Sequence, residues 1–299
     1  MMTLDVAIAG AGPAGCGAAV QCSRLGLDAA LLDMTGSAGG LVREARLLEN
    51  YPGLPEPVSG EVLVRYLRRM IDDNGMAPIE FDLLKVSLEG GSGGSFRLEG
   101  REGVLRARAV ILAVGTRPVD FNLKTTGQVT VHRSIIPLLR LRPARTLIVG
   151  GGEAALDYAL NLAVHGTGVT VAVRGDGLKA RGRLPAEAMG HPGIDIRYNT
   201  APLSASGRDG GVIDVRLSTP EGVMSISTDA VLAAVGRKAL LPSWERRPEW
   251  EPGSVRTDIH GVFVAGDASL GSLGQASIAT GHGVQAATLA CRYLEDGRR

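Results

Sequence analysis

The segment of residues 4–15, LDVAIAGAGPAG, decides how the start of this chain folds. Its first six residues are mostly apolar, which is typical of a buried parallel strand. The glycines that follow, Gly10, Gly12 and Gly15, have GxGxxG spacing. In this pattern the first glycine permits a tight turn, the second lets backbone N–H groups approach a pyrophosphate, and the third allows helix and strand to pack closely.

The residues after these glycines complete a dinucleotide-binding unit. A helix-like stretch begins at Pro13 and Ala14, and a second apolar run, residues 29–32, ends in Asp33. Asp33 lies 33 − 12 = 21 residues past Gly12, where a carboxylate can accept hydrogen bonds from both ribose hydroxyls. Strand, glycines, helix, strand and acid therefore occur in the order that this unit requires.

The same pattern recurs in the middle of the chain. The apolar run of residues 146–149 leads into the sequence GGGEAA, residues 150–155, and helix-like and strand-like stretches follow at 156–164 and 169–173. By the same reasoning, the second phosphate-binding turn consists of Gly150, Gly152, Glu153 and Ala155.

The second unit ends in a basic residue instead of an acidic one. Arg174 lies 174 − 152 = 22 residues past Gly152, nearly the position of Asp33 in the first unit, and Lys179 follows in the same loop. A guanidinium binds a 2′-phosphate with two hydrogen bonds, whereas a carboxylate there would repel it. The sequence therefore favours NADP, with NAD as the alternative if the loop is only a solvated basic surface.

Two dinucleotide sites on one chain are typical of proteins that hold a flavin at one site and exchange a nicotinamide nucleotide at the other. The predicted fold class is α/β with two Rossmann-like dinucleotide-binding domains. Catalytic residues cannot be assigned from these patterns.

The composition excludes several other classes of function. The 299 residues are 44% hydrophobic, and 32 basic against 31 acidic residues give a net charge of +1. This balance offers no electrostatic reason to expect a nucleic acid or membrane partner, and the apolar stretches are too short to span a bilayer. Three cysteines without CxxC or metal-ligand spacing predict a cytoplasmic protein without a metal site.

Further motifs resemble the thioredoxin reductase-like branch of the FAD/NAD(P) disulfide oxidoreductases. They are GGL (39–41), NYPG (50–53), AVGTRP (113–118), AVGRK (234–238), GVFVAGD (261–267) and QAS (275–277). The resemblance implies that Asp267 binds the ribityl chain of FAD and that the backbone near Val86 contacts its adenine. The other residues that it places at FAD are Gly40, Leu41, Asn50, Ala113, Gly115, Gly266, Gln275, Ala276 and Ser277.

The family layout also implies the domain order and a homodimer. Residues 1–115 and 241–299 would form a discontinuous FAD domain, with an NAD(P) domain at 116–240 inserted between them. The glycine-rich residues 90–94 then fit a hairpin turn within the FAD domain better than a linker.

The chain departs from thioredoxin reductases at the redox-active dithiol. Counted back from Gly150 without a gap, the two cysteines of the family's CxxC fall on Arg133 and Ile136. The loop of residues 173–180 keeps part of the family's HRRDxxRA pattern, with Gly175 in place of the second arginine. Residues 150–159 and 278–283 are similar to motifs of the ferredoxin or flavodoxin–NADP reductases of this fold, which lack the dithiol.

These observations predict an FAD-dependent NAD(P)H oxidoreductase that passes electrons to a ferredoxin or flavodoxin without a protein dithiol. One alternative is an NAD(P)H-dependent reductase of a small molecule or quinone. Another is a flavin-binding regulatory subunit with weak nicotinamide binding. Arginine clusters at residues 65–69 and 140–145 are candidate docking sites for an acidic carrier, or else solvated surfaces.

Three further side chains have roles that the sequence leaves open. Cys16 follows the first glycine turn, where a helix N-terminus can lower a thiol pKa, but a buried packing role is the simpler interpretation. His282 lies in the last helix and is a candidate to donate a proton or tune the flavin. His132 adjoins the missing dithiol. For both histidines a packing or surface role is the alternative.

Overall fold

A computed structural model describes residues 3–90 and 94–296 of the chain. It divides into two compact units. Unit 1 comprises Met1–Arg43, Leu47–Arg117 and Lys238–Arg299, and unit 2 comprises Glu44–Arg46 and Pro118–Arg237. These boundaries lie within three residues of the positions 115/116 and 240/241 expected from the sequence, apart from the short segment Glu44–Arg46.

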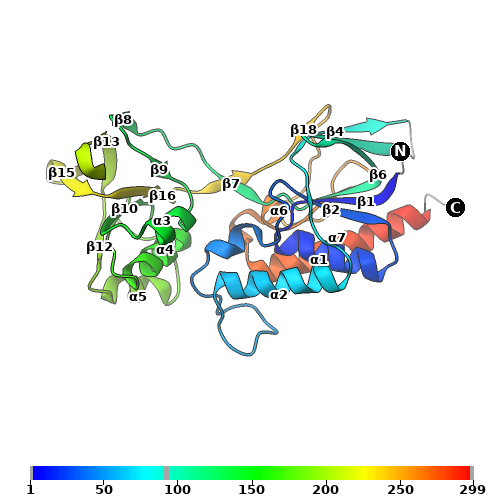
Figure 1. Ribbon diagram of the computed structural model, residues 1–299, viewed down its shortest axis with the longest axis horizontal. Helices are drawn as coiled ribbons and strands as arrows, with labels where there is room; N and C mark the ends of the chain where they lie inside the picture. The colour runs from blue at the N-terminus through cyan, green and yellow to red at the C-terminus, as the bar shows by residue number, and fades with distance from the viewer. Residues whose placement is uncertain (1–2, 91–93, 297–299) are drawn as a thin grey trace. The chain divides into compact units, whose positions relative to one another are not determined.

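Unit 1 is a mixed sheet with helices α1, α2 and α7 along one face (Figure 1). The strand order is β18-β4-β5-β6-β1-β2-β3, and β19 pairs with β6 beside this path. The strands are β1 (Leu4–Ala9), β2 (Ala29–Asp33), β3 (Ile79–Glu80), β4 (Leu83–Glu89), β5 (Ser95–Gly100), β6 (Gly103–Leu112), β18 (Ser243–Trp244) and β19 (Val262–Val264). The helices are α1 (Pro13–Arg24), α2 (Gly60–Asp73), α6 (Asp267–Leu270) and α7 (Ala276–Asp296), with 3-10 turns η1 (Gly40–Glu44) and η3 (Gly271–Leu273).

The alternation of side chains along β1 explains why its buried part, residues 6–9, is apolar throughout. Val6 and Ile8 belong to the core cluster that includes residues of α1, α2 and α7, whereas Ala7 belongs to a second cluster formed with the antiparallel strands. A strand that is buried on both faces needs apolar residues at every position. The central strand pairs in parallel with β2 and β6, as a Rossmann-like unit requires.

The predicted hairpin around residues 90–94 agrees with the strands on either side of it. β4 and β5 pair antiparallel up to the pair Glu89↔Ser95. Residues 91–93, the tip of the predicted turn, lie outside the described residues.

Unit 2 has a parallel sheet, a second sheet that is antiparallel apart from one parallel strand, and several helices. The strand order of the parallel sheet is β12-β11-β10-β16-β9. The strand order of the second sheet is β15-β14-β13-β8. The strands are β8 (Lys124–Thr126), β9 (Val131–His132), β10 (Arg145–Val149), β11 (Gly168–Ala172), β12 (Ile194–Arg197), β13 (Ala201–Gly207), β14 (Ile213–Thr219), β15 (Gly222–Thr228) and β16 (Ala230–Ala233). The helices are α3 (Ile136–Leu141), α4 (Glu153–Ala163) and α5 (Leu184–Gly190), with a 3-10 turn η2 (Asp209–Gly211).

The core of unit 2 repeats the arrangement of unit 1. On β10, Ile148 belongs to the cluster that includes residues of α3, α4 and α5, whereas Leu147 and Val149 belong to the cluster formed with β13 and β14. β7 (Thr116–Pro118) and β17 (Arg237–Ala239) pair where the chain passes from one unit to the other and back. The predicted α/β class with two Rossmann-like units is therefore confirmed.

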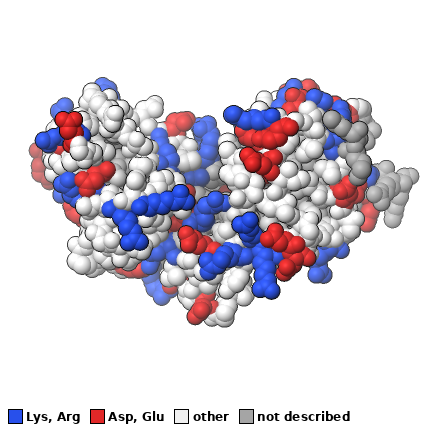
Figure 2. Space-filling model, viewed as in Figure 1, with Lys and Arg blue, Asp and Glu red and all other residues white. Residues whose placement is uncertain are grey.

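The surface carries charges of both signs. On the face shown in Figure 2, Lys and Arg side chains lie among Asp and Glu side chains on both units. Within residues 3–90 and 94–296, no helix is long and apolar enough to cross a membrane.

Candidate functional site

The turn after β1 can be made only by glycine. Gly10 has φ = +105°, and a Cβ on it would lie 2.3 Å from the carbonyl oxygen of Ala113. A Cβ on Gly15 would lie 1.7 Å from the carbonyl oxygen of Gly10. These contacts are shorter than atoms can approach, so the first and third glycines have the turn and packing roles that the GxGxxG pattern predicts.

Gly12 leaves the N-terminus of α1 open for a ligand. It is the N-cap residue of α1, and no side chain there accepts a hydrogen bond from the first turn. Gly40 faces it, and a Cβ on Gly40 would lie 3.0 Å from the Cα of Gly12. Two facing glycines thus leave bare backbone beside a helix N-terminus, which favours anions. This arrangement fits the pyrophosphate of FAD.

Asp33 is held in place by the same turn. Its Oδ2 accepts a hydrogen bond from the backbone N–H of Ala11 at 3.0 Å. Its Oδ1 accepts bonds from the backbone N–H and hydroxyl of Thr35 at 2.9 and 2.7 Å. Because a carboxylate offers about four acceptor positions, two on each oxygen, Oδ2 can still accept a ribose hydroxyl. The carboxylate is therefore oriented for its predicted role.

The motif near the end of the sequence meets the first turn of α1. Gly266 has φ = +71°, and a Cβ on it would lie 2.8 Å from the Cβ of Ala14. Asp267 begins α6 directly after it. A Cβ on Gly283 of α7 would lie 1.8 Å from the carbonyl oxygen of Ala14, so α7 packs against the start of α1 with no space between them. The fold thus brings Asp267 and α7 to the first glycine turn.

For the other residues predicted to bind FAD, the structure gives weaker support. Val86 is fully buried on β4, whose neighbours are β5 and β18, three places away from β1 in the strand order. Asn50 is exposed, while the hydroxyl of the adjacent Tyr51 lies 3.1 Å from that of Thr280 on α7. The roles of Val86 and Asn50 stay predictions. The others, Leu41, Gly115, Gln275, Ala276 and Ser277, lie in η1, after β6, and at the start of α7.

The second glycine turn repeats the geometry of the first. Gly150 has φ = +140°, and a Cβ on it would lie 2.3 Å from the carbonyl oxygen of Ala234, matching the distance between Gly10 and Ala113. Gly152 is the N-cap of α4 and faces open space. Ala155 replaces the third glycine, with its Cβ 3.6 Å from the Cβ position of Gly150.

A pocket of about 710 Å³ lies at the carboxyl ends of β10, β11 and β16. In a parallel sheet this edge, next to the strand where the order reverses, is where nucleotides bind. Gly150, Gly152 and Glu153 line the pocket, and so do Arg174 and Lys179. The volume and the two cations fit a nicotinamide dinucleotide with a 2′-phosphate.

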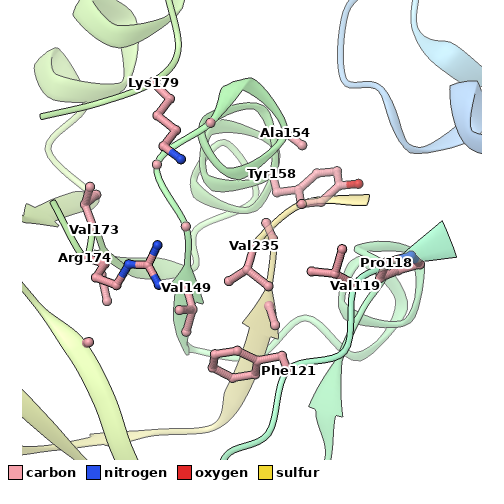
Figure 3. A pocket seen from close by; sticks show the side chains of 18 of the residues that line it. Pro118, Val119, Phe121, Val149, Ala154, Tyr158, Val173, Arg174, Lys179 and Val235 are labelled. Atoms are coloured by element: carbon pink, nitrogen blue, oxygen red, sulfur yellow. The ribbon is translucent and has the colours of Figure 1, made fainter. Parts of the chain in front are cut away.

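The loop with the two cations is attached to the glycine turn. The backbone N–H of Lys179 donates to the carbonyl oxygen of Gly151 at 2.7 Å, and a Cβ on Gly151 would lie 2.8 Å from Cγ1 of Val173. Arg174 and Lys179 are exposed and lie on the opposite side of the pocket from Val119 (Figure 3). The fold thus brings the predicted phosphate-binding turn and both cations to one pocket.

The other wall of this pocket was not predicted from the sequence. Val119, Phe121, Val235 and Tyr158 line it. Tyr158 donates a hydrogen bond to the carboxylate of Glu44, and burial, with the nearby Glu44 charge, raises the pKa of its phenol. Val235 belongs to the return motif at 234–238 and Tyr158 to the motif at 150–159, but neither motif predicted a role in a pocket wall. The others are placed by contacts between distant parts of the chain.

Arg133 and Ile136 occupy the positions expected for the redox cysteines. Arg133 follows β9 and lines the same pocket. Its guanidinium donates to the carbonyl oxygens of Val119 and Phe121 at 3.3 and 2.9 Å, and its Cζ lies 5.4 Å from the centre of the Phe121 ring. Ile136 is the first residue of α3. Neither side chain can form a thiolate.

The structure confirms the simpler interpretation of Cys16, a buried packing residue, over that of a reactive thiol at a helix N-terminus. Cys16 is 1% exposed, and its thiol donates to the carbonyl oxygen of Ala11 at 3.4 Å. Burial, with the Asp33 charge as a smaller cause, raises its pKa to about 12. Burial likewise raises the pKa of Cys22 to about 12. Both are packing residues of the α1 core.

The two histidines singled out from the sequence are partly buried. Burial lowers the pKa of His132, which lies on β9, and of His282, which lies on α7. The Nδ1 atom of His282 is buried without a hydrogen-bond partner among the described residues. Both imidazoles are therefore biased toward the neutral form at neutral pH.

Known proteins resemble this chain along nearly its whole length. Thioredoxin reductases of Penicillium chrysogenum and Bacillus subtilis are 28% and 29% identical to it, covering 99% and 98% of this chain and 97% and 95% of their own. Among solved structures, the thioredoxin reductase of Lactococcus lactis has a TM-score of 0.86 at 23% identity, covering 98% of this chain and all of its own. That of T. acidophilum has a TM-score of 0.82 at 25% identity, covering 99% of each.

The sequence model of one family matches residues 4–283, which include both glycine turns and the motif around Asp267. The chain therefore belongs to the pyridine nucleotide-disulphide oxidoreductase family, in which the thioredoxin reductases use FAD and NADPH as cofactors.

Proposed function

We propose that this protein oxidises NADPH through FAD and delivers the electrons to an acceptor outside the chain, without a protein dithiol. The observation that carries the proposal is the identity of residues 133 and 136. Arg133 and Ile136 stand where the family resemblance places the two cysteines. The buried thiols of Cys16 and Cys22, with pKa values of about 12, offer no replacement.

When bound, the two cofactors supply the redox chemistry, in which NADPH gives a hydride and FAD accepts it. The chain supplies binding and orientation. In unit 1, the bare N-terminus of α1 and the carboxylates of Asp33 and Asp267 would bind phosphates and hydroxyls. In unit 2, the N-terminus of α4 and the cations Arg174 and Lys179 would bind the pyrophosphate and 2′-phosphate.

The acceptor that we favour is a one-electron carrier of the ferredoxin or flavodoxin type. The balanced reaction is NADPH plus two oxidised carriers giving NADP⁺, two reduced carriers and one proton, in either direction. The similarity of residues 150–159 and 278–283 to the carrier reductases supports this choice. On α2, Arg65 and Arg68 are exposed and would contact an acidic carrier, while the neighbouring Arg69 forms an ion pair with Asp73 at 3.7 Å.

One observation favours a second candidate function, a flavin-binding regulatory subunit with weak nicotinamide binding. Gly175 stands where the resemblance expects a second arginine beside Arg174, and it faces open space. The 2′-phosphate would thus have fewer cationic partners than in the dithiol enzymes. On this alternative the bound flavin would not be reduced by NADPH or NADH.

We also propose that the protein is a cytoplasmic homodimer. The homodimer is supported by the family resemblance, and a reducing compartment is supported by the sequence, in which Cys16, Cys22 and Cys291 have neither CxxC nor metal-ligand spacing. Size-exclusion chromatography with light scattering would give twice the chain mass of 31.1 kDa if the protein is a dimer, and a mass of one chain would contradict it.

The test of the proposed function is an anaerobic titration of the FAD-loaded protein. We expect NADPH to bleach the flavin absorbance, and oxidised ferredoxin or flavodoxin then to restore it. A flavin that neither NADPH nor NADH reduces would favour the regulatory subunit. A flavin that NADPH reduces but that only a quinone or another small molecule reoxidises would replace the carrier with a small-molecule acceptor.

A further inference from the structure

Arg133 fastens one wall of the pocket in unit 2. The wall is the segment of residues 118–121, which runs between the end of β7 at Pro118 and the start of β8 at Lys124. Val119 and Phe121 belong to neither strand, so their carbonyl groups are not bonded within a sheet. They accept hydrogen bonds from the two terminal nitrogens of Arg133, at 3.3 and 2.9 Å.

Two other contacts hold the same segment. The backbone N–H of Val119 donates to the carbonyl oxygen of Gly236 at 3.0 Å. The ring of Phe121 lies under the guanidinium, 5.4 Å from its Cζ, and packs against the core between the two sheets of unit 2. The wall is thus fixed from both sides, by Gly236 after β16 and by Arg133 after β9.

The position of Arg133 is itself rigid. The preceding residues Val131 and His132 pair with Val231 and Leu232 of β16, and Ile135 is fully buried in the core. A side chain on so fixed a backbone can hold a neighbouring loop in one place. Two other segments line the pocket and are attached to the same parallel sheet: the glycine turn at 150–152 and the loop with Arg174.

We infer that Arg133 is a positioning residue for the nicotinamide nucleotide: its guanidinium holds the wall of residues 118–121 in the shape that the bound nucleotide contacts. A cysteine at position 133 could not do this, because a thiol is a single weak donor and cannot reach two carbonyl groups. The position of a redox cysteine in the dithiol enzymes therefore serves nucleotide binding in this chain. The inference rests on the nucleotide-binding role of the pocket in the proposed function, and not on the identity of the acceptor.

The test compares NADP⁺ binding by the FAD-loaded wild type with that by Arg133→Met and Arg133→Lys. Methionine keeps much of the side-chain length without a donor, and lysine keeps the charge without the two-pronged geometry. Arg216→Ala is the matched control, since Arg216 is an exposed arginine of β14 that does not line the pocket. Titration calorimetry gives the dissociation constant of NADP⁺, and hydrogen exchange reports on residues 118–122.

We expect the dissociation constant to rise about tenfold in Arg133→Met and less in Arg133→Lys, as for the loss of hydrogen bonds from a charged donor. Exchange at the amide of Val119 should rise in Arg133→Met without NADP⁺, while exchange in β10 and β11 stays at the wild-type level. The flavin absorbance spectrum and the FAD content should not change. Arg216→Ala should match the wild type in every measurement.

Two results would overturn this inference and leave the proposed function intact. One is a dissociation constant equal to that of the wild type in both Arg133 variants. The other is a loss of NADP⁺ binding accompanied by loss of FAD or by faster exchange throughout unit 2, which would indicate a general structural role. If Arg133→Met does not fold, Arg133→Lys decides the test. A wild type that does not bind NADP⁺ would refute both this inference and the proposed function.

Discussion

Cys16 and Cys22 show how burial sets the chemistry of a residue. With a pKa of about 12, only about one thiol in 10⁴ is ionised at pH 8, so neither can act as a nucleophile at a useful rate. Alkylation with iodoacetamide at pH 8 should therefore modify the partly exposed Cys291 in the native protein, and all three cysteines only in denaturant. Mass spectrometry of peptides would detect each site. Rapid native labelling of Cys16 would show that its thiol is activated and would reopen a thiol mechanism.

We expect residues 174 and 175 to determine how well the protein distinguishes NADPH from NADH. Replacing Arg174 with alanine removes a cation from the 2′-phosphate end of the pocket, and we expect KM for NADPH to rise tenfold or more, on the order of 1.5–3 kcal/mol. KM for NADH should change little, since NADH lacks the phosphate. Steady-state flavin reduction with each nucleotide measures both.

Gly175 offers the reverse substitution. A side chain there meets open space, and the backbone does not require glycine. Gly175→Arg should therefore fold normally and lower KM for NADPH several-fold, while Gly177→Ala in the same loop serves as a control without added charge. If each substitution, Arg174→Ala or Gly175→Arg, changes KM for NADPH and KM for NADH by the same factor, this loop does not bind the 2′-phosphate.

The two strand–turn–helix elements make the same steric demand in different units. A Cβ at Gly10 or at Gly150 would lie 2.3 Å from a carbonyl oxygen, of Ala113 in one unit and of Ala234 in the other, and both glycines have positive φ. Alanine at either position must displace the turn from the adjacent strand. We expect Gly10→Ala to abolish FAD retention and Gly150→Ala to abolish NADP⁺ binding.

The two variants act as controls for each other. Gly150→Ala should still purify with FAD, which the visible absorbance of the flavin would show. Gly26→Ala, at the end of α1, tests the strain of positive φ without a close contact, since a Cβ there meets no neighbour. Loss of FAD from Gly150→Ala would indicate that the two elements are not independent binding sites.

For the molecule as a whole, the features that could be predicted from the sequence are those set by residues close together in the chain. Both glycine turns, the strands that lead into them and the two-unit α/β fold are short-range patterns of apolar runs and turn residues, and the structure contains them. The contact of Gly266 with Ala14 was anticipated only through the family resemblance, because about 250 residues separate them in the sequence.

The features that the sequence did not predict arise from packing between distant segments. Nothing local marks Phe121 as part of a pocket wall or Tyr158 as a partner of Glu44, since these contacts exist only after the sheets and helices have assembled. Arg133 had a signal in the sequence only because the family resemblance expects a cysteine at that position, and its two carbonyl partners are brought to it by the fold. The helix N-terminus that suggested an activated Cys16 is outweighed by burial.

The binding of FAD and a nicotinamide nucleotide at two separate sites of one chain can be tested in a single experiment. The purified protein, reconstituted with FAD and passed through a desalting column, is titrated with NADP⁺ in a calorimeter. We expect one FAD to be retained per chain and one NADP⁺ to bind reversibly without displacing it. A chain that retains no FAD, or that releases FAD as NADP⁺ binds, would refute the two-site arrangement.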